Sequence, residues 1–315
     1  MKLLLSKPRG FCAGVEMAIE VVEEALKIWP APIYVKHEIV HNRHVVDDLA
    51  QKGAIFIEDL NEVPEGARLI YSAHGVSPCV RDLAKKRNIF EIDATCPLVT
   101  KLHSASKRFA QKGYQIILIG HKNHVEVVGT YGEAPDQTTV VENVEDVQNL
   151  TFDPDEKIFY LMQTTLSLDE VKEILEALKE RYPQAITLPS SSICFATTNR
   201  QEALKKITVG ADLILVVGDE KSSNSNRLKE IGDYRNIPSY LINNPQEINS
   251  EWLKNVQVIS MTAGASTPDH VVQSCIQKLR EFGVTEIEEV VHTEENVVFD
   301  VPRVIKRARE HAQEI

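Results

Sequence analysis

The sequence predicts an α/β fold made of three similar units with mainly parallel sheets. Three cysteines, Cys12, Cys96 and Cys194, each stand just before a run of residues with the apolar spacing of a helix. A polar loop follows each cysteine after 28 or 29 residues, and a second one follows after 62 to 72 residues. Strand-like and helix-like runs alternate between them, which favours parallel sheets covered by helices. The recurrence indicates one supersecondary unit used three times.

The first unit is expected over residues 1–96. LLLS predicts a strand, residues 14–28 predict a helix that Pro30 and Pro32 end, and PIYVK predicts a second strand. HEIVHNR is expected to form a loop before a helix that closes at Gly53. AIFIE and ARLIYSAHG supply two further strands, and a helix and the strand IFEID lead to the second cysteine.

The second and third units are expected over residues 97–193 and 194–282. The second has a helix with proline at its first position, the strand YQIILIG, the polar loop HKNHVEVVGTYGEAP and the strands TTVVEN, KIFYLMQ and AITLPS. Ser167 is expected to cap its last helix. The third has a helix, the strand ADLILVVG, the loop DEKSSNSNRL, a helix, the strands SYLIN and VQVISMTAG, and a final helix. Residues 283–315 break the repeat and are expected to cap the fold.

The composition excludes several classes of protein. The chain has 315 residues, 43% of them hydrophobic and 26% charged, which is ordinary for a globular protein. A net charge of −11 argues against a nucleic-acid partner. The longest apolar runs have the length of core strands, and the N-terminus has no signal-like apolar region, so we expect a cytoplasmic protein without a membrane partner. Five widely spaced cysteines in that compartment indicate thiols or a metal centre rather than disulfides.

The three repeated cysteines are candidate metal ligands. Three thiolates that meet at one centre could bind zinc or an iron–sulfur cluster, and a helix N-terminus favours the thiolate form of a nearby cysteine. Because clusters normally take four thiolates, three would leave one iron open to a substrate. The alternative is three buried free cysteines that only pack, since cysteine is among the most buried residue types. Cys79 and Cys275 fall outside the repeat and are assigned to packing.

The polar loops follow strands, and the carboxyl ends of parallel strands are where ligands collect. Small donors placed before helices suit a phosphate or diphosphate, although each could equally be an ordinary cap or turn residue. Glu126 is the one carboxylate among these loops, and it is either a proton donor or a solvated loop residue. The candidate anion ligands are His41, His74, His124, Ser222, Ser223, Asn224 and Ser266.

Residues 37–41 match the HExxH pattern of zinc proteases but predict no such site. That pattern works on a helix, where both histidines share one face. Here it continues the β-rich PIYVK segment, so we expect a loop. The sequence also has no GxGxxG and no GxxxxGK[ST], so a nucleotide cofactor has no support.

Nine segments resemble one known family, the 4-hydroxy-3-methylbut-2-enyl diphosphate reductases, which act last in the methylerythritol phosphate route to isoprenoids. The resemblance runs in register from Arg9 to about Asp269. The matching segments are RGFCAGV, HEIVHN, SAHGVSP, DATCPLVTK, HKNHVEVVGT, QTTLS, SSICFATTNRQEA, SSNSNRL and TAGASTPD.

The resemblance implies a pseudo-threefold (trefoil) arrangement of the three units around a central [4Fe–4S] cluster held by Cys12, Cys96 and Cys194. It implies a two-electron reductive dehydroxylation that gives isopentenyl diphosphate and dimethylallyl diphosphate. Glu126 would supply protons, aided by Thr164 and His124. The diphosphate would be held by His41, His74, His124, Ser222, Ser223, Asn224 and Ser266. Electrons would come from ferredoxin or flavodoxin.

Three other functions remain open from the residues. A carbon–oxygen lyase with three cysteines on a [4Fe–4S] cluster would need no electrons. A non-enzymatic iron–sulfur sensor that binds diphosphates would hold a cluster without turnover. A thiol-dependent zinc enzyme would be distinguished by its metal content.

Overall fold

The computed structural model describes residues 1–153, 155–190 and 192–313, so residue 191 of the SSIC motif and the last two residues of the tail lie outside the described residues. The fold is α/β with three separate sheets, and every strand pair in them is parallel. This confirms the expected fold class. The chain divides into two compact units, which are described one at a time. The first unit comprises residues 1–16, 41–47 and 195–298, and the second comprises residues 17–40, 48–194 and 299–315.

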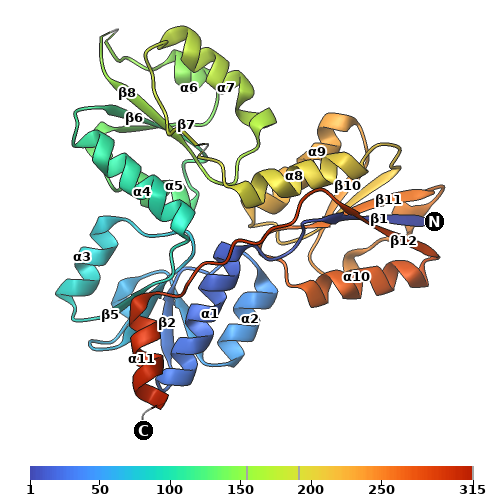
Figure 1. The fold of residues 1–315 in the computed structure, drawn as a ribbon, viewed down its shortest axis with the longest axis horizontal. Coiled ribbons are helices and arrows are strands. Elements are labelled where there is room, and N and C mark those ends of the chain that lie inside the picture. The colour runs from blue at the N-terminus through green and yellow to red at the C-terminus, as the bar shows by residue number, and fades with distance from the viewer. Residues whose placement is uncertain (154, 191, 314–315) are drawn as a thin grey trace. The chain divides into compact units, whose positions relative to one another are not determined.

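The first compact unit contains the five-stranded sheet, whose order is β10-β9-β11-β1-β12. Helices α8 and α9 lie on one face of this sheet and α10 on the other (Figure 1). The strands are β1 (Lys2–Lys7), β9 (Leu213–Val217), β10 (Ser239–Ile242), β11 (Val258–Ala263) and β12 (Glu286–Val291). The helices are α8 (Phe195–Ile207), α9 (Ser223–Arg235) and α10 (Asp269–Glu281).

Burial on both faces explains the apolar strand β9. All five of its residues are buried, and side chains alternate between the faces of a sheet. Leu213 and Leu215 belong to the core cluster that includes α10, whereas Ile214 and Val216 belong to the cluster with α8 and α9. The strand is therefore held by two cores, and its carboxyl end is a rigid place to attach a loop.

The second compact unit contains the other two sheets, of order β3-β2-β4-β5 and β7-β6-β8. The strands are β2 (Ile33–Lys36), β3 (Ala54–Ile57), β4 (Arg68–Tyr71), β5 (Phe90–Asp93), β6 (Gln115–Ile119), β7 (Thr138–Val141) and β8 (Ile158–Met162). Helices α1 (Ala13–Ile28) and α2 (Arg43–Gln51) have residues in both units. The remaining helices are α3 (Pro78–Lys86), α4 (Pro97–Ala110), α5 (Val125–Tyr131), α6 (Val144–Gln148), α7 (Leu168–Arg181) and α11 (Arg303–Gln313). Ser167 caps α7 with a full capping box, as predicted.

Four features differ from the sequence expectation. The polar segment after β6 contains helix α5, and helix α6 was not expected at all. AITLPS forms only an isolated bridge between Ile186 and Phe159. Strand β1 was expected in the first unit of the repeat, but it pairs with β11 and β12. Strand β12 comes from the expected capping segment and forms the edge of this sheet. That segment ends in α11, where Arg309 pairs with Glu20 and Glu24 of α1 at 3.2 and 2.9 Å.

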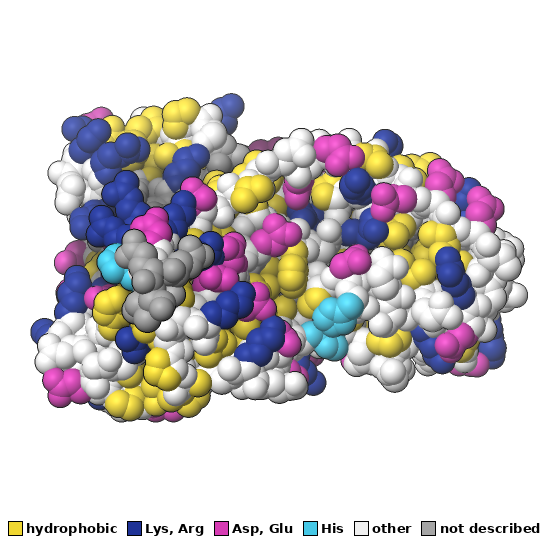
Figure 2. Space-filling model, turned by 60° about the horizontal axis from the view of Figure 1, so that its bottom comes forward, with side chains coloured by type: hydrophobic (Ala, Val, Ile, Leu, Met, Phe, Trp, Pro, Cys, Tyr) yellow, Lys and Arg dark blue, Asp and Glu magenta, His cyan; other side chains and the backbone are white. Residues whose placement is uncertain are grey.

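Charged side chains of both signs are interspersed over the face shown in Figure 2. Many form exposed ion pairs, such as Lys2 with Glu286 and Glu288 at 2.7 Å each. An exposed pair of this kind contributes about 0–1 kcal/mol, because water and salt screen it. The stability of the fold therefore depends on the buried apolar clusters rather than on the surface charge.

Candidate active site

Each of the three repeated cysteines stands directly before a helix, as the sequence predicts. Cys12 precedes α1, Cys96 is the N-cap residue of α4, and Cys194 precedes α8. None of the three forms a disulfide bond, and all three are partly exposed. The alternative that they are buried packing residues is therefore wrong.

The same backbone hydrogen bond recurs at all three cysteines. The N–H group of each donates to a carbonyl group that follows the end of a strand, which is β11, β4 and β8 in turn. The sequence analysis grouped each cysteine with the polar loops that follow it in its own repeat. The hydrogen bonds instead join each cysteine to a polar loop of a different repeat. The bonds are Cys12 N–H to Ala265 O (3.2 Å), Cys96 N–H to Ala73 O (3.0 Å) and Cys194 N–H to Thr164 O (3.0 Å).

The other two cysteines differ from each other. Cys275 is fully buried in the core of the first unit, and burial raises the pKa of its thiol to about 12. Its assignment to packing is therefore confirmed. Cys79 is exposed in the first turn of α3, so its assignment to packing is wrong.

Glu126 lies on a helix and not in a loop. Helix α5 begins after His124, whose Nδ1 atom accepts a hydrogen bond from the Glu126 N–H group at 3.2 Å. Four polar residues directly before Val125 hid this helix from sequence analysis, although the residues that cap helices are commonly polar. Glu126 is only 3% exposed, so the alternative of a solvated loop glutamate is wrong.

The Glu126 carboxyl group is bonded to Thr164 at both of its oxygens. The Thr164 N–H group donates to Oε1 and the Thr164 hydroxyl group donates to Oε2, each at 2.6 Å. Burial raises the pKa of Glu126, and the two Thr164 bonds and the charge of His103 oppose this shift. A buried carboxyl group that holds its proton at higher pH and touches a hydroxyl group is suited to proton transfer.

Three histidines of the second unit lie close to α5, the helix that carries Glu126, or to one another. The rings of His74 and His124 lie edge to face with centroids 6.0 Å apart, and the Nδ1 atom of His74 contacts the Ser72 hydroxyl group at 3.2 Å. The sequence analysis missed His103, which lies on the buried face of α4 with Nδ1 2.9 Å from Glu133. Only the helical period of α4 could have predicted its burial.

Glycines let His103 approach two of the site segments. A Cβ atom at Gly75, next to His74, would lie 3.1 Å from the His103 ring, and one at Gly129 of α5 would lie equally close. Gly75 also has φ +77°, which a side chain would disfavour. The His103 ring therefore packs between the segments that carry the candidate histidines.

The N-terminus of α9 carries three candidate anion ligands in the first unit. The helix begins at Ser223, inside the segment expected to be a loop, and the Ser222 hydroxyl group caps it by accepting from the Ser225 N–H group at 3.3 Å. Asn224 is 3% exposed, and neither atom of its amide group has a hydrogen-bond partner among the described residues. Since buried polar groups are normally paired, the Asn224 amide is suited to receive a ligand.

His41 and Ser266 lie together in the same unit. The Ser266 hydroxyl group donates to the His41 carbonyl oxygen at 2.9 Å, and Ser266 is buried. Ser266 follows β11, whose neighbour β9 leads to the Ser222 loop. Cβ atoms added at Gly218 and Gly264 would lie 2.4 and 2.1 Å from the Ser225 hydroxyl oxygen, so both strand ends need glycine to pack against α9.

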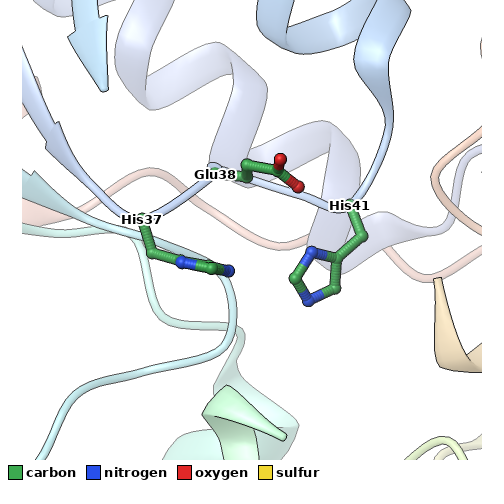
Figure 3. A group of neighbouring side chains, drawn as sticks. All are labelled: His37, Glu38 and His41. Atoms are coloured by element: carbon green, nitrogen blue, oxygen red, sulfur yellow. The ribbon is translucent and has the colours of Figure 1, made fainter. Parts of the chain in front are cut away.

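The HExxH segment is not helical, as predicted. Residues 37–41 lie between β2 and α2 without helical structure, and Figure 3 shows His37, Glu38 and His41 on this loop. His37 has φ +62°, which no helix residue adopts. The zinc-protease interpretation is therefore excluded on backbone geometry.

Known proteins resemble this chain over nearly its whole length. The model of the LytB protein family matches residues 3–280. A 4-hydroxy-3-methylbut-2-enyl diphosphate reductase of Protochlamydia amoebophila is 68% identical over 98% of this chain and 99% of its own, and that of Chlamydia abortus is 60% identical over 97% and 99%. A solved structure of the E-1-hydroxy-2-methyl-but-2-enyl-4-diphosphate reductase from Plasmodium falciparum has a TM-score of 0.97 at 48% identity and covers 99% of both chains.

These similarities and the parallel α/β fold define an enzyme of the oxidoreductase class. None of the helices in the described part of the chain is long and apolar enough to cross a membrane. The chain belongs to the LytB protein family of reductases.

Proposed function

We propose that the chain is an iron–sulfur reductase that converts (E)-4-hydroxy-3-methylbut-2-enyl diphosphate to isopentenyl diphosphate and dimethylallyl diphosphate. The allylic C–O bond breaks, two electrons and two protons enter, and water leaves. The observation that carries this proposal is the threefold recurrence of a partly exposed cysteine without a disulfide bond at a helix start, whose N–H group donates to a carbonyl group just after the end of a strand.

The donor set fits an iron–sulfur cluster. Cys12, Cys96 and Cys194 form no disulfide bond and are partly exposed, and thiolates are the ligands that such clusters take. Three protein ligands suit a [4Fe–4S] cluster with one iron left open. When bound, the cluster would supply electrons and a Lewis acid to the reaction.

Glu126 would deliver protons to the substrate through Thr164 and His124. Burial raises its pKa, so the carboxyl group holds a proton to higher pH than an exposed glutamate does, and the Thr164 hydroxyl group at 2.6 Å offers the first step of a path. A positioned acid of this kind contributes about 10²–10⁴-fold to a rate. His124 is the N-cap residue of α5, and the hydrogen bond from the Glu126 N–H group to its Nδ1 atom fixes its ring against the first turn of that helix.

The diphosphate would be bound by amide, hydroxyl and imidazole groups. The Asn224 amide and the Ser222 and Ser223 hydroxyl groups stand at the N-terminus of α9, where backbone N–H groups and the helix dipole favour an anion. Ser266 and the three histidines His41, His74 and His124 would complete the set. Fixing the anion would hold the allylic alcohol in a reactive orientation.

Electrons would come from a ferredoxin or a flavodoxin, because the sequence has no dinucleotide-binding motif of its own. Such carriers and the diphosphate substrate are intracellular, so we propose that the enzyme works in the cytoplasm.

The test is iron and sulfide content after oxygen-free purification, combined with turnover under a strong chemical reductant. We expect about four irons and four sulfides per chain and consumption of the diphosphate. Cys96→Ser should lose iron and turnover together, whereas Cys79→Ser should lose neither, because Cys79 is exposed and not one of the repeated cysteines.

Other outcomes would identify the competing functions. A cluster without consumption of reductant would indicate a lyase or a sensor. Zinc in place of iron would contradict the proposal, and full iron content in Cys96→Ser would remove Cys96 from the ligand set.

A further inference from the structure

Arg200 is the largest fully buried side chain among the described residues, with 1% of its surface exposed. It lies on α8 in the first unit and donates to three backbone carbonyl groups. Its Nε and Nη2 atoms lie 3.1 and 2.8 Å from the Gly10 oxygen, Nη2 lies 3.0 Å from the Phe11 oxygen, and Nη1 lies 2.9 Å from the Ala196 oxygen. Two of these acceptors are the residues directly before Cys12.

A carboxylate balances the buried guanidinium charge. Glu295 accepts from Nη1 of Arg200 at 3.0 and 3.2 Å and from the Asn199 amide at 2.9 Å. A buried charge is costly unless it is paired and its donors are bonded, and here both conditions are met. Lysine could not replace this arrangement, because its ammonium group lacks the planar fork that reaches several acceptors at once.

The loop before Cys12 needs such support. Gly10 has φ +68°, and a Cβ atom there would lie 3.2 Å from the Thr267 oxygen, so the loop runs close against the segment after β11. The backbone bonds of this loop are at the long end of the usual range, at 3.3 Å from Gly10 N–H to the oxygen of Ala263, the last residue of β11, and 3.2 Å from Cys12 N–H to the Ala265 oxygen. Cys96 differs, because Pro97 follows it and fixes the start of α4.

We propose that Arg200 is a positioning residue for Cys12, and this inference rests on the proposed cluster. The guanidinium group fixes the carbonyl groups of residues 10 and 11, and thereby the direction in which the Cys12 thiol leaves the backbone. Since α8 begins directly after Cys194, the same residue joins the Cys12 loop to the helix that follows a second proposed ligand. Glu295, in the segment after β12, pairs with Arg200 and so helps to hold the guanidinium group in the position that fixes the Cys12 loop.

The experiment compares Arg200→Lys with the unaltered chain, both purified without oxygen. Iron per chain, the rate at which a chelator removes iron, and the order in which iodoacetamide alkylates the cysteines are measured, the last by mass spectrometry of peptides. We expect iron loss to be faster by about tenfold or more, because several charge-assisted hydrogen bonds are lost. Cys12 should be alkylated before Cys96 and Cys194 in the variant.

Two further variants separate positioning from general damage. Glu295→Gln keeps the arginine and its carbonyl bonds, so it should show the same order of alkylation with a smaller change in rate. Arg87→Lys is the matched control, because Arg87 also donates to two backbone carbonyl groups, those of Leu60 and Val63, but belongs to the second unit, whereas Cys12 belongs to the first. It should leave iron loss and alkylation unchanged.

The outcomes decide between the two claims. Unchanged iron loss and unchanged alkylation in Arg200→Lys would overturn the positioning role, and so would equal acceleration at all three cysteines. If the unaltered chain binds no iron, the proposed cluster fails. In that case faster alkylation of Cys12 alone in Arg200→Lys would still support the positioning role, and its absence would overturn it.

Discussion

The two groups of candidate site residues differ in how their hydrogen bonds are satisfied. In the second unit, both oxygens of Glu126 are bonded to Thr164 at 2.6 Å, and His124 caps the same helix. In the first unit, Asn224 is equally buried, but its amide has no partner among the residues that the structure describes. The Glu126 carboxyl group is therefore hydrogen-bonded before any ligand binds, whereas the Asn224 amide is not.

Under the proposed function, this difference would separate the residues that take part in the reaction from the residues that bind the substrate. A bonded carboxyl group keeps its orientation and its raised pKa before the substrate arrives, so no reorganisation is needed during the reaction. An unpaired buried amide destabilises the folded protein by about 1–3 kcal/mol, and a ligand that bonds to the amide can offset this cost. Substitutions in the first group should therefore act mainly on kcat, and those in the second mainly on KM.

The largest effect is expected from Glu126→Gln. Glutamine retains an acceptor for the Thr164 N–H group, and its amide can donate to the Thr164 hydroxyl group, so the local geometry should persist. It cannot deliver a proton, so kcat should fall by about 10²–10⁴-fold with iron content and KM nearly unchanged. Glu145→Gln is the control, since Glu145 is exposed on α6. Steady-state kinetics under reductant measure both, and a kcat within about twofold of the unaltered chain would exclude Glu126 as the proton donor.

Local patterns in the sequence predict much of this comparison. Each repeated cysteine precedes a helix as expected, because apolar residues recur with helical period after it. Ser167 caps α7 because serine three residues before glutamate satisfies two backbone donors at a helix start. Parallel sheets follow from the alternation of strands with helices.

Tertiary packing explains what the sequence alone could not predict. The burial of Glu126 depends on α5, which is only seven residues long and therefore gives a weak periodic pattern. AITLPS has the composition of a strand, yet only Ile186 pairs with a neighbour. The sequence analysis did not select Arg200 or His103, because their contacts are with carbonyl groups and glycines that are distant in the sequence.

Asn224→Ala should give the next largest effect. The substitution would remove a proposed ligand of the diphosphate, so KM should rise by about tenfold or more while kcat changes little. The unfolding midpoint should not fall, because the deleted group has no partner in the described structure. Asn249→Ala is the control, since Asn249 is an exposed cap residue elsewhere in the same unit. An unchanged KM would show that the unpaired amide is not a ligand-binding group.

The smallest effect concerns stability and pH. The unfolded-state pKa of a glutamate is near 4.5, and burial raises the pKa of Glu126 in the folded chain above this value. Below pH 4.5 the carboxyl group is protonated in both states and costs nothing. As the pH rises, the unfolded chain ionises first, so the folded state loses stability by at most about 1.4 kcal/mol per pH unit until the folded pKa is passed.

Glu126→Gln should remove this loss. The thermal midpoint of the variant minus that of the unaltered chain, at equal iron content, should therefore increase as the pH rises from 4.5 towards neutral. The reason is that the buried carboxyl group of the unaltered chain is destabilised when it ionises, and the glutamine amide does not ionise. Glu145→Gln should show no such trend, because exposed Glu145 is already in water. A midpoint difference that stays constant with pH would mean that Glu126 ionises as easily in the folded chain as in water. The contrast between a complete proton-donor group and an incomplete anion group would then lose its electrostatic basis, and only the unpaired Asn224 amide would distinguish the two.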